Sequence, residues 1–87
     1  MKLTPSEKQI LRFLIFPETF EDLLEESGVT YGTLRDDLIN LISHRYVEVY
    51  TFDKSTPVSP FYDSDNLEQF AFKATKTGLK SIQSHAV

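Results

Sequence analysis

The hydrophobic positions of this 87-residue chain change spacing partway along, from a helical repeat in the first half to alternation in the second. The first helical stretch covers about Pro5–Ile15, and its apolar face consists of Ile10, Leu11 and Leu14. Thr4 followed by Pro5 is typical of a helix start, and Pro17 cannot continue a helix because it lacks the backbone N–H. The pattern therefore predicts a first helix that ends ahead of Pro17.

Two further helical stretches follow, separated by a glycine. The second begins at the capping residue Thr19 and ends at Gly28, because glycine adopts the left-handed conformation after a helix without steric cost. Thr30 caps the third helix, whose predicted core stripe is Leu34, Leu38, Leu41 and the stem of Arg45, flanked by Tyr31 and Ile42. The opposite face, which a partner would meet, consists of Gly32, Asp36, Asn40 and Ser43, with Thr33 and Arg35 at its borders.

Apolar and polar residues begin to alternate along the chain where the third predicted helix ends. Tyr46–Phe52 predicts a strand with Val47 and Val49 on one face, and Leu67–Ala74 predicts a second strand antiparallel to it. Residues 53–66 contain two prolines and many turn-forming residues, so they predict a long loop. Thr75 then caps a short last helix over residues 76–85, with Leu79 and Ile82 facing inward.

The order is therefore helix, helix, helix, strand, long loop, strand and short helix. It resembles the winged helix-turn-helix superfamily of prokaryotic transcription regulators, such as those of the MarR and GntR types, in the segments TFEDLLEESGVTYGTLRDDLINLISHRYVEV and FKATKTGLKSI. The resemblance implies one α+β domain, mostly α, over residues 1–87. Its parts would be a three-helix bundle with the helix-turn-helix at 20–45, a β-hairpin wing at 46–74 with its loop at 53–66, and the last helix at 76–85.

Composition changes this picture mainly through charge. Asp and Glu number 13 against 9 Lys and Arg, a net charge of −4, whereas nucleic-acid modules are usually basic. The chain has no Cys, and its longest apolar run, Phe13–Phe16, is far below the roughly 18 residues of a membrane helix. No catalytic triad or phosphate-binding glycine loop stands out. We expect a soluble cytoplasmic protein that is not an enzyme and uses no metal, cofactor, membrane or small-molecule substrate.

The resemblance also implies a site on double-stranded DNA, with the third helix in the major groove. Its residues would be Thr30, Tyr31, Thr33, Arg35, Asp36 and Lys54. Thr30 and Thr33 lie at the helix start, where exposed N–H groups suit a phosphate, and Arg35 is the candidate for guanine. A purely structural interpretation is also open, in which Thr30 only caps the helix and Tyr31 only packs beside the core.

Two features depart from the DNA-binding pattern. Asp36 and Asp37 lie on the third helix, where carboxylates oppose phosphate, and the loop carries one Lys, Lys54, against Asp53, Asp63 and Asp65. The alternative function is a protein-interaction module that does not bind DNA, with Asp36, Asn40, Phe61 and Tyr62 as its contact residues. The other interpretation of Phe61 and Tyr62 is that they fold back and cover the edge of the core. We place DNA binding by a transcription regulator first, weak as a monomer, with a protein partner or homodimer as the alternative.

Overall fold

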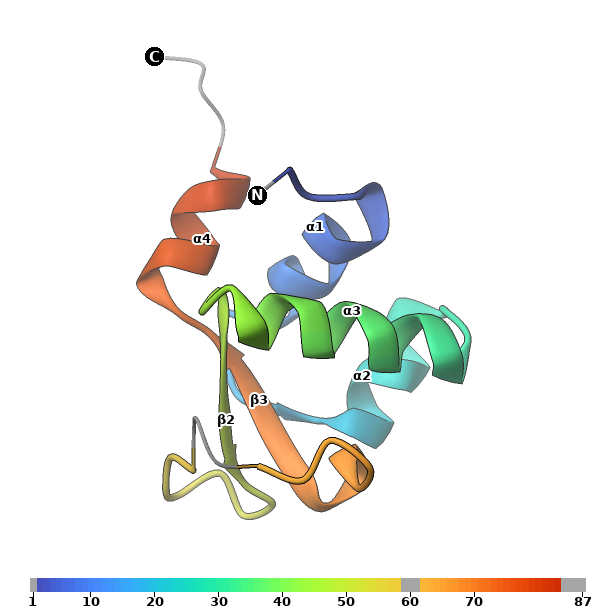
Figure 1. The fold of residues 1–87 in the computed structure, drawn as a ribbon, viewed down its shortest axis with the longest axis vertical. Helices are drawn as coiled ribbons and strands as arrows, with labels where there is room; N and C mark the ends of the chain where they lie inside the picture. Colours follow the sequence, from blue (N-terminus) through green and yellow to red (C-terminus); the bar gives the residue numbers. More distant parts are fainter. Residues whose placement is uncertain (1, 59–61, 84–87) are drawn as a thin grey trace.

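The computed structural model describes residues 2–58 and 62–83. In these residues four α-helices pack around a three-stranded antiparallel sheet, which confirms a small α+β domain. The elements are α1 (Pro5–Phe13), β1 (Glu18–Thr19), α2 (Phe20–Ser27), α3 (Tyr31–Ser43), β2 (Val47–Thr51), the 3₁₀ helix η1 (Leu67–Gln69), β3 (Phe70–Ala74) and α4 (Lys76–Ile82). Figure 1 shows α1 and α4 at one end of the molecule and the β2–β3 connection at the other. None of the described helices has the length and apolar character needed to cross a bilayer.

All four described α-helices begin with a threonine at the N-cap position. In each case the hydroxyl oxygen accepts a hydrogen bond from the backbone N–H three residues later, as seen at Thr4, Thr19, Thr30 and Thr75. This bond satisfies one of the donors that a helix start leaves without a partner. At Thr4 the bond is reciprocal, because the carboxylate of Glu7 accepts from the Thr4 N–H at 2.9 Å. All four helix starts are confirmed.

The helix ends differ more from the predictions. Gly28 takes the left-handed conformation after α2, as expected, with φ at 70°. The first helix ends at Phe13, two residues before the predicted Ile15, because the chain turns at Leu14. There the Leu14 carbonyl accepts from the Ala74 N–H of the sheet.

The end of α3 corrects the prediction for Arg45. The helix stops at Ser43, and Arg45 has φ 62° and an exposed side chain, so its stem is not part of the core stripe. The Arg45 N–H donates to the carbonyl of Ile42, and the Tyr46 N–H donates to that of Leu41. This is the Schellman arrangement, in which the left-handed residue is usually glycine. The rest of the predicted stripe is buried.

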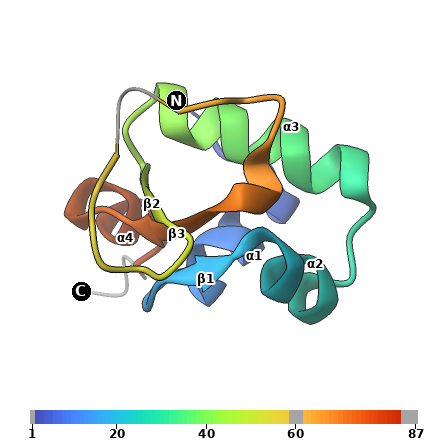
Figure 2. The same ribbon diagram turned by 90° about the horizontal axis from the view of Figure 1, so that it is seen from below.

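The sheet has one strand more than the sequence pattern predicts. The residues of β1, Glu18 and Thr19, pair with Phe72 and Ala71, so that β3 lies between β1 and β2 (Figure 2). A strand of two residues is too short to show alternation, which is why the pattern missed it.

The two predicted strands are shorter than expected. The first covers Val47–Thr51 rather than Tyr46–Phe52, and both of its valines are buried as predicted. The second covers Phe70–Ala74 rather than Leu67–Ala74, because Leu67–Gln69 form the 3₁₀ helix η1. Leu67 still enters the core.

A glycine in α4 allows this last helix to pack closely against the residues that follow α3. A Cβ at Gly78 would overlap the carbonyl oxygen of Tyr46 and press on the side chain of Leu11. The helix ends at Ile82, with Gln83 extended, so it is shorter than the predicted 76–85, and residues 84 and 85 lie outside the described residues. Leu79 and Ile82 pack against the core as predicted.

We predict opposite effects for alanine at two helical glycines. Gly78→Ala should lower the free energy of unfolding by about 2–3 kcal/mol, because the backbone of Tyr46 cannot yield to the new methyl group. Gly32→Ala is the matched control, because a Cβ at Gly32 has no neighbour within 4 Å. It should raise stability by up to about 1 kcal/mol through helix propensity alone. Urea unfolding measures both, and equal effects of the two changes would contradict this packing of α4.

Candidate functional site

The candidate site is the exposed side of α3 together with the segment that leads into β3. At the start of α3, Thr30 is exposed. Its hydroxyl oxygen accepts from the Thr33 N–H at 3.2 Å, and its O–H donates to the Thr33 hydroxyl oxygen at 2.9 Å. Both threonines therefore form the helix cap. Beside them Gly32 is open on its outer side, so the backbone of the first turn can be approached.

Tyr31 connects α3 to η1. Its ring packs at 5.0 Å between centroids from Phe20, which is part of the core. Its hydroxyl donates to a carboxylate oxygen of Glu68 at 2.9 Å, and this bond is the main reason that the pKa of Tyr31 is raised. The side chain remains 47% exposed. Tyr31 thus packs beside the core, as the structural interpretation expects, and leaves an aromatic edge accessible.

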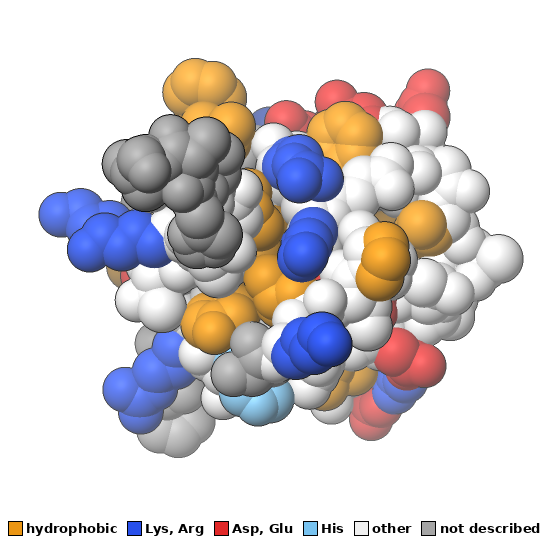
Figure 3. All heavy atoms as spheres, turned by 90° about the horizontal axis from the view of Figure 1, so that it is seen from above, with side chains coloured by type: hydrophobic (Ala, Val, Ile, Leu, Met, Phe, Trp, Pro, Cys, Tyr) orange, Lys and Arg blue, Asp and Glu red, His pale blue; other side chains and the backbone are white. Residues whose placement is uncertain are grey.

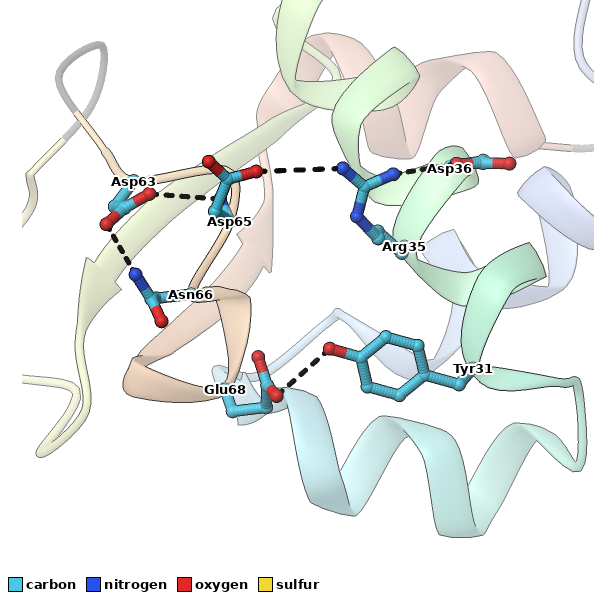
Figure 4. A network of polar contacts seen from close by, with 7 residues as sticks. All are labelled: Tyr31, Arg35, Asp36, Asp63, Asp65, Asn66 and Glu68. Carbon is cyan, nitrogen blue, oxygen red and sulfur yellow. Dashed lines mark hydrogen bonds and ion pairs between the residues drawn. The ribbon is translucent and has the colours of Figure 1, made fainter.

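Arg35 is held between two carboxylates, as Figure 4 shows. Its guanidinium lies 3.3 Å from Oδ1 of Asp36 on the same helix and 3.9 Å from Oδ1 of Asp65 in the β2–β3 connection. Asp36 and Asp65 are 74% and 85% exposed, so both pairs are formed in contact with water. Surface pairs of this kind stabilise a fold by about 0–1 kcal/mol. They nevertheless neutralise the one cationic side chain of α3.

Asp63 organises the turn that carries Asp65. One of its carboxylate oxygens accepts from the Asp65 N–H at 3.0 Å, and the other accepts from the side-chain amide of Asn66 at 2.6 Å. Among the described residues no group of three or more His, Cys, Asp or Glu side chains is placed to hold a metal ion. In this turn Asp63 holds the local geometry and Asp65 pairs with Arg35.

Two other polar residues of α3 are tied to α1. Asp37 accepts a hydrogen bond from the Ser6 hydroxyl at 2.7 Å, and the side-chain amide of Asn40 donates to Glu7 at 2.6 Å. Glu7 is buried, so this second bond satisfies a carboxylate inside the protein. Asn40 is exposed, but its amide is already engaged. Sequence reasoning placed Asn40 on the outer face and missed its structural partner, which lies 33 positions away.

Lys54 belongs to a different neighbourhood. It lies in the turn after β2 with φ 67°, and the charged group that it influences is Glu18 of β1. Burial raises the pKa of Glu18, Glu26 raises it further, and Lys54 opposes these two effects. The cation proposed from sequence for the DNA backbone therefore acts electrostatically on a carboxylate of β1.

Tyr62 lies at a hollow near the other end of α3. The hollow has a volume of about 600 Å³ and is lined by Ile42, Ser43, Arg45, Val47, Glu48, Tyr62 and Thr75. Tyr62 packs against the core, and its burial raises its pKa. This position fits the interpretation that the aromatic side chain covers the core. Phe61 lies outside the described residues.

Charge on this side of the molecule is strongly unbalanced. Arg35 is the only cation in α3 and in residues 62–69, against the five carboxylates of Asp36, Asp37, Asp63, Asp65 and Glu68. We use the name acidic face for the exposed carboxylates Asp36, Asp65 and Glu68 together with Arg35 and Tyr31, which contact them. Comparisons with protein-family models, with curated proteins and with solved structures found no match.

We predict that two aspartates contribute to stability with opposite dependence on pH. Burial, together with Glu7 and Asp36, raises the pKa of Asp37 above 3.8, so its ionised form weakens the fold. Asp37→Asn should therefore raise Tm at pH 7, and the gain should disappear as pH falls through the raised pKa toward 3.8. The variant keeps an oxygen that can accept from Ser6.

Asp53 is the control with the opposite sign. Hydrogen bonds from Thr51 and Ser55 lower its pKa to about 2, so its ionised form stabilises the fold. Asp53→Asn should lower Tm at pH 7, and the loss should shrink as pH falls from 3.8 toward about 2. Thermal unfolding of both variants followed by circular dichroism across this range measures the effect. A difference from wild type that does not vary with pH would contradict the assignment.

Proposed function

We propose that this chain is a winged-helix protein-interaction module whose acidic face binds a cationic surface of another protein. The arrangement of α1, α2, α3 and the β2–β3 hairpin supports a winged helix, with α3 at the position of the recognition helix. The observation that supports this function best is that Arg35 already forms two ion pairs. Its guanidinium is already paired with Asp36 and Asp65, and carboxylates are what the rest of the face offers to a partner.

The chemistry of the face defines the partner. Asp36 and Asp65 are largely exposed, and Glu68, which accepts from the Tyr31 hydroxyl, is exposed as well, so a Lys or Arg side chain can reach all three. Complementary charge of this kind increases association rates and selects partners. Tyr31 supplies an exposed aromatic ring among these carboxylates, which is the residue type that most often anchors an interface. The proposed partner is therefore a Lys- or Arg-rich protein segment.

DNA binding by the same helix is the second candidate, in which the chain acts in the cytoplasm as a transcription regulator. The open backbone of Gly32 at the exposed start of α3 favours it, because a phosphate can approach the N–H groups of this turn. Arg35 would have to exchange both of its carboxylates for a base or a phosphate. A second copy on an adjacent half-site would supply the affinity that one acidic domain lacks.

We predict that one substitution changes the two activities in opposite directions. Arg35→Ala releases Asp36 and Asp65, so it should tighten binding of a short arginine–serine repeat peptide several-fold, in line with a surface pair of about 0.5–1 kcal/mol. If α3 instead bound DNA, the same change should abolish binding of a mixed-sequence duplex at α3. Amide chemical-shift titrations at low and physiological salt follow both ligands residue by residue.

Carboxylate variants supply the control for the peptide. Asp65→Asn with Glu68→Gln should remove the peptide-induced shifts at Tyr31 and Asp36. Asp22→Asn with Glu25→Gln changes the net charge equally on exposed positions of α2 and should leave those shifts in place. Duplex-induced shifts at Thr33 and Arg35 that Arg35→Ala abolishes would replace the proposal with DNA binding. Absence of shifts with either ligand at low salt would remove both.

A further inference from the structure

The helices α1 and α4 pack side by side and together carry four exposed cationic side chains. Five of the nine Lys and Arg residues are exposed in these two helices and in the residues before α1, namely Lys2, Lys8, Arg12, Lys76 and Lys80. Figure 3 views this side and shows Lys and Arg side chains at its centre and left, with Asp and Glu mainly toward the right and upper edges. We call these five residues the cationic surface.

Two of the other four cations have a carboxylate as a direct neighbour. Arg35 is paired with Asp36 and Asp65, and Lys73 lies directly across the sheet from Glu48. On the cationic surface, by contrast, the one carboxylate within α1 and α4 is Glu7, which is buried and accepts from Thr4 and Asn40. All five cations of the surface are exposed, so they are available to an external anion.

The spacing of these cations points to a densely charged anion. Lys8 and Arg12 are four residues apart on α1, and Lys76 and Lys80 are four apart on α4, so each pair of like charges lies on one face of its helix. Such pairs repel each other and weaken their helices slightly unless a partner neutralises them. A nucleic-acid backbone supplies closely and regularly spaced phosphates, and its binding releases counterions.

The composition of the surface separates this partner from an acidic protein. Four of the five cations are Lys, which binds phosphate as a point charge and does not impose the fork geometry of Arg. Figure 3 also shows apolar side chains among the cations of this side, but the large apolar side chains that are most exposed in the described residues, Ile15, Phe16, Tyr31 and Phe52, lie outside α1 and α4. The cations themselves are therefore the most accessible groups of these two helices, and contacts to phosphate need no apolar anchor.

We propose that the cationic surface binds the phosphate backbone of nucleic acid without sequence preference. This activity is separate from that of the acidic face, because no residue is shared and the two surfaces involve different helices. The chain would then connect a nucleic acid on α1 and α4 to a cationic protein on α3. Because its net charge is −4, binding is restricted to this one surface and becomes measurable at low salt.

Fluorescence anisotropy of a labelled mixed-sequence duplex, titrated with the full chain over a range of salt concentrations, tests the proposal. Five phosphate contacts give a slope of log affinity against log salt of at most about −4.5, and unrelated duplex sequences should give the same affinity within about twofold. The variant Lys8→Gln, Arg12→Gln, Lys76→Gln, Lys80→Gln should reduce the slope to about −1 and bind more weakly at every salt concentration.

The chain offers a control with the same net charge. Arg35→Gln, Arg45→Gln, Lys54→Gln and Lys73→Gln also remove four cations but leave the cationic surface intact, so the slope should stay within one unit of wild type. Circular dichroism verifies that both variants fold, and single substitutions replace any that does not.

Several results would overturn the proposal. One is an equal loss of binding in the two variants, since net charge alone would then explain it. Another is absence of binding by wild type at low salt. A third is competition by poly-L-glutamate that matches unlabelled duplex at equal charge, which would identify an acidic protein as the partner. None of these results bears on the acidic face, whose test uses a cationic peptide and different residues.

Discussion

The architecture depends on the junction at Ala74 and Thr75, where β3 ends and α4 begins. The Ala74 N–H donates to the carbonyl of Leu14 at 2.9 Å, and the Thr75 N–H donates to that of Tyr46 at 3.0 Å. The Thr75 hydroxyl donates to the carbonyl of Arg45 at 2.8 Å while its oxygen caps α4. Two residues thus connect the end of α1, the end of α3 and the start of α4. Gly78 permits the contact, because no side chain fits against Tyr46.

This junction also separates the charges. Because α4 is fixed against α1 and Tyr46, its lysines join those of α1 on one side, whereas η1 and the turn at Asp65 lie beside α3. The molecule measures 38 × 25 × 20 Å, and charges in physiological salt are screened over about 8 Å. Each surface therefore presents its own charge to a partner at short range, and the net charge of −4 describes neither.

Local signals in the sequence predicted the parts of the fold that depend on neighbouring residues. The threonine caps, Gly28 and the buried leucines of α3 could be read because each needs only residues within about four positions. The strand β1 could not, since two residues show no alternation and their partners are more than 50 positions away. The end of α3 was misplaced because Arg45 occupies a conformation that glycine usually marks.

The candidate site divides in the same way. Sequence placed Asp36 on the outer face of α3, Arg35 at the border of that face and Tyr31 at the flank of the core stripe, and the excess of carboxylates was visible in composition alone. The pairing of Arg35 with Asp65 and of Tyr31 with Glu68 spans 30 or more positions, so it follows only from the packing of the β2–β3 connection. The cationic surface was missed for the same reason, because α1 and α4 lie at opposite ends of the chain.

The contacts of Arg35 and Tyr31 also determine how the acidic face can respond to a partner. Both connect α3 to residues 65–68 through groups that are exposed to water, so each contributes about 1 kcal/mol or less. A partner therefore displaces only weak contacts when it binds this face. An incoming cation can replace Arg35 at Asp65 with little penalty, whereas an incoming phosphate must be approached by Arg35 with two carboxylates left unpaired beside it. This asymmetry favours a cationic partner over DNA at α3.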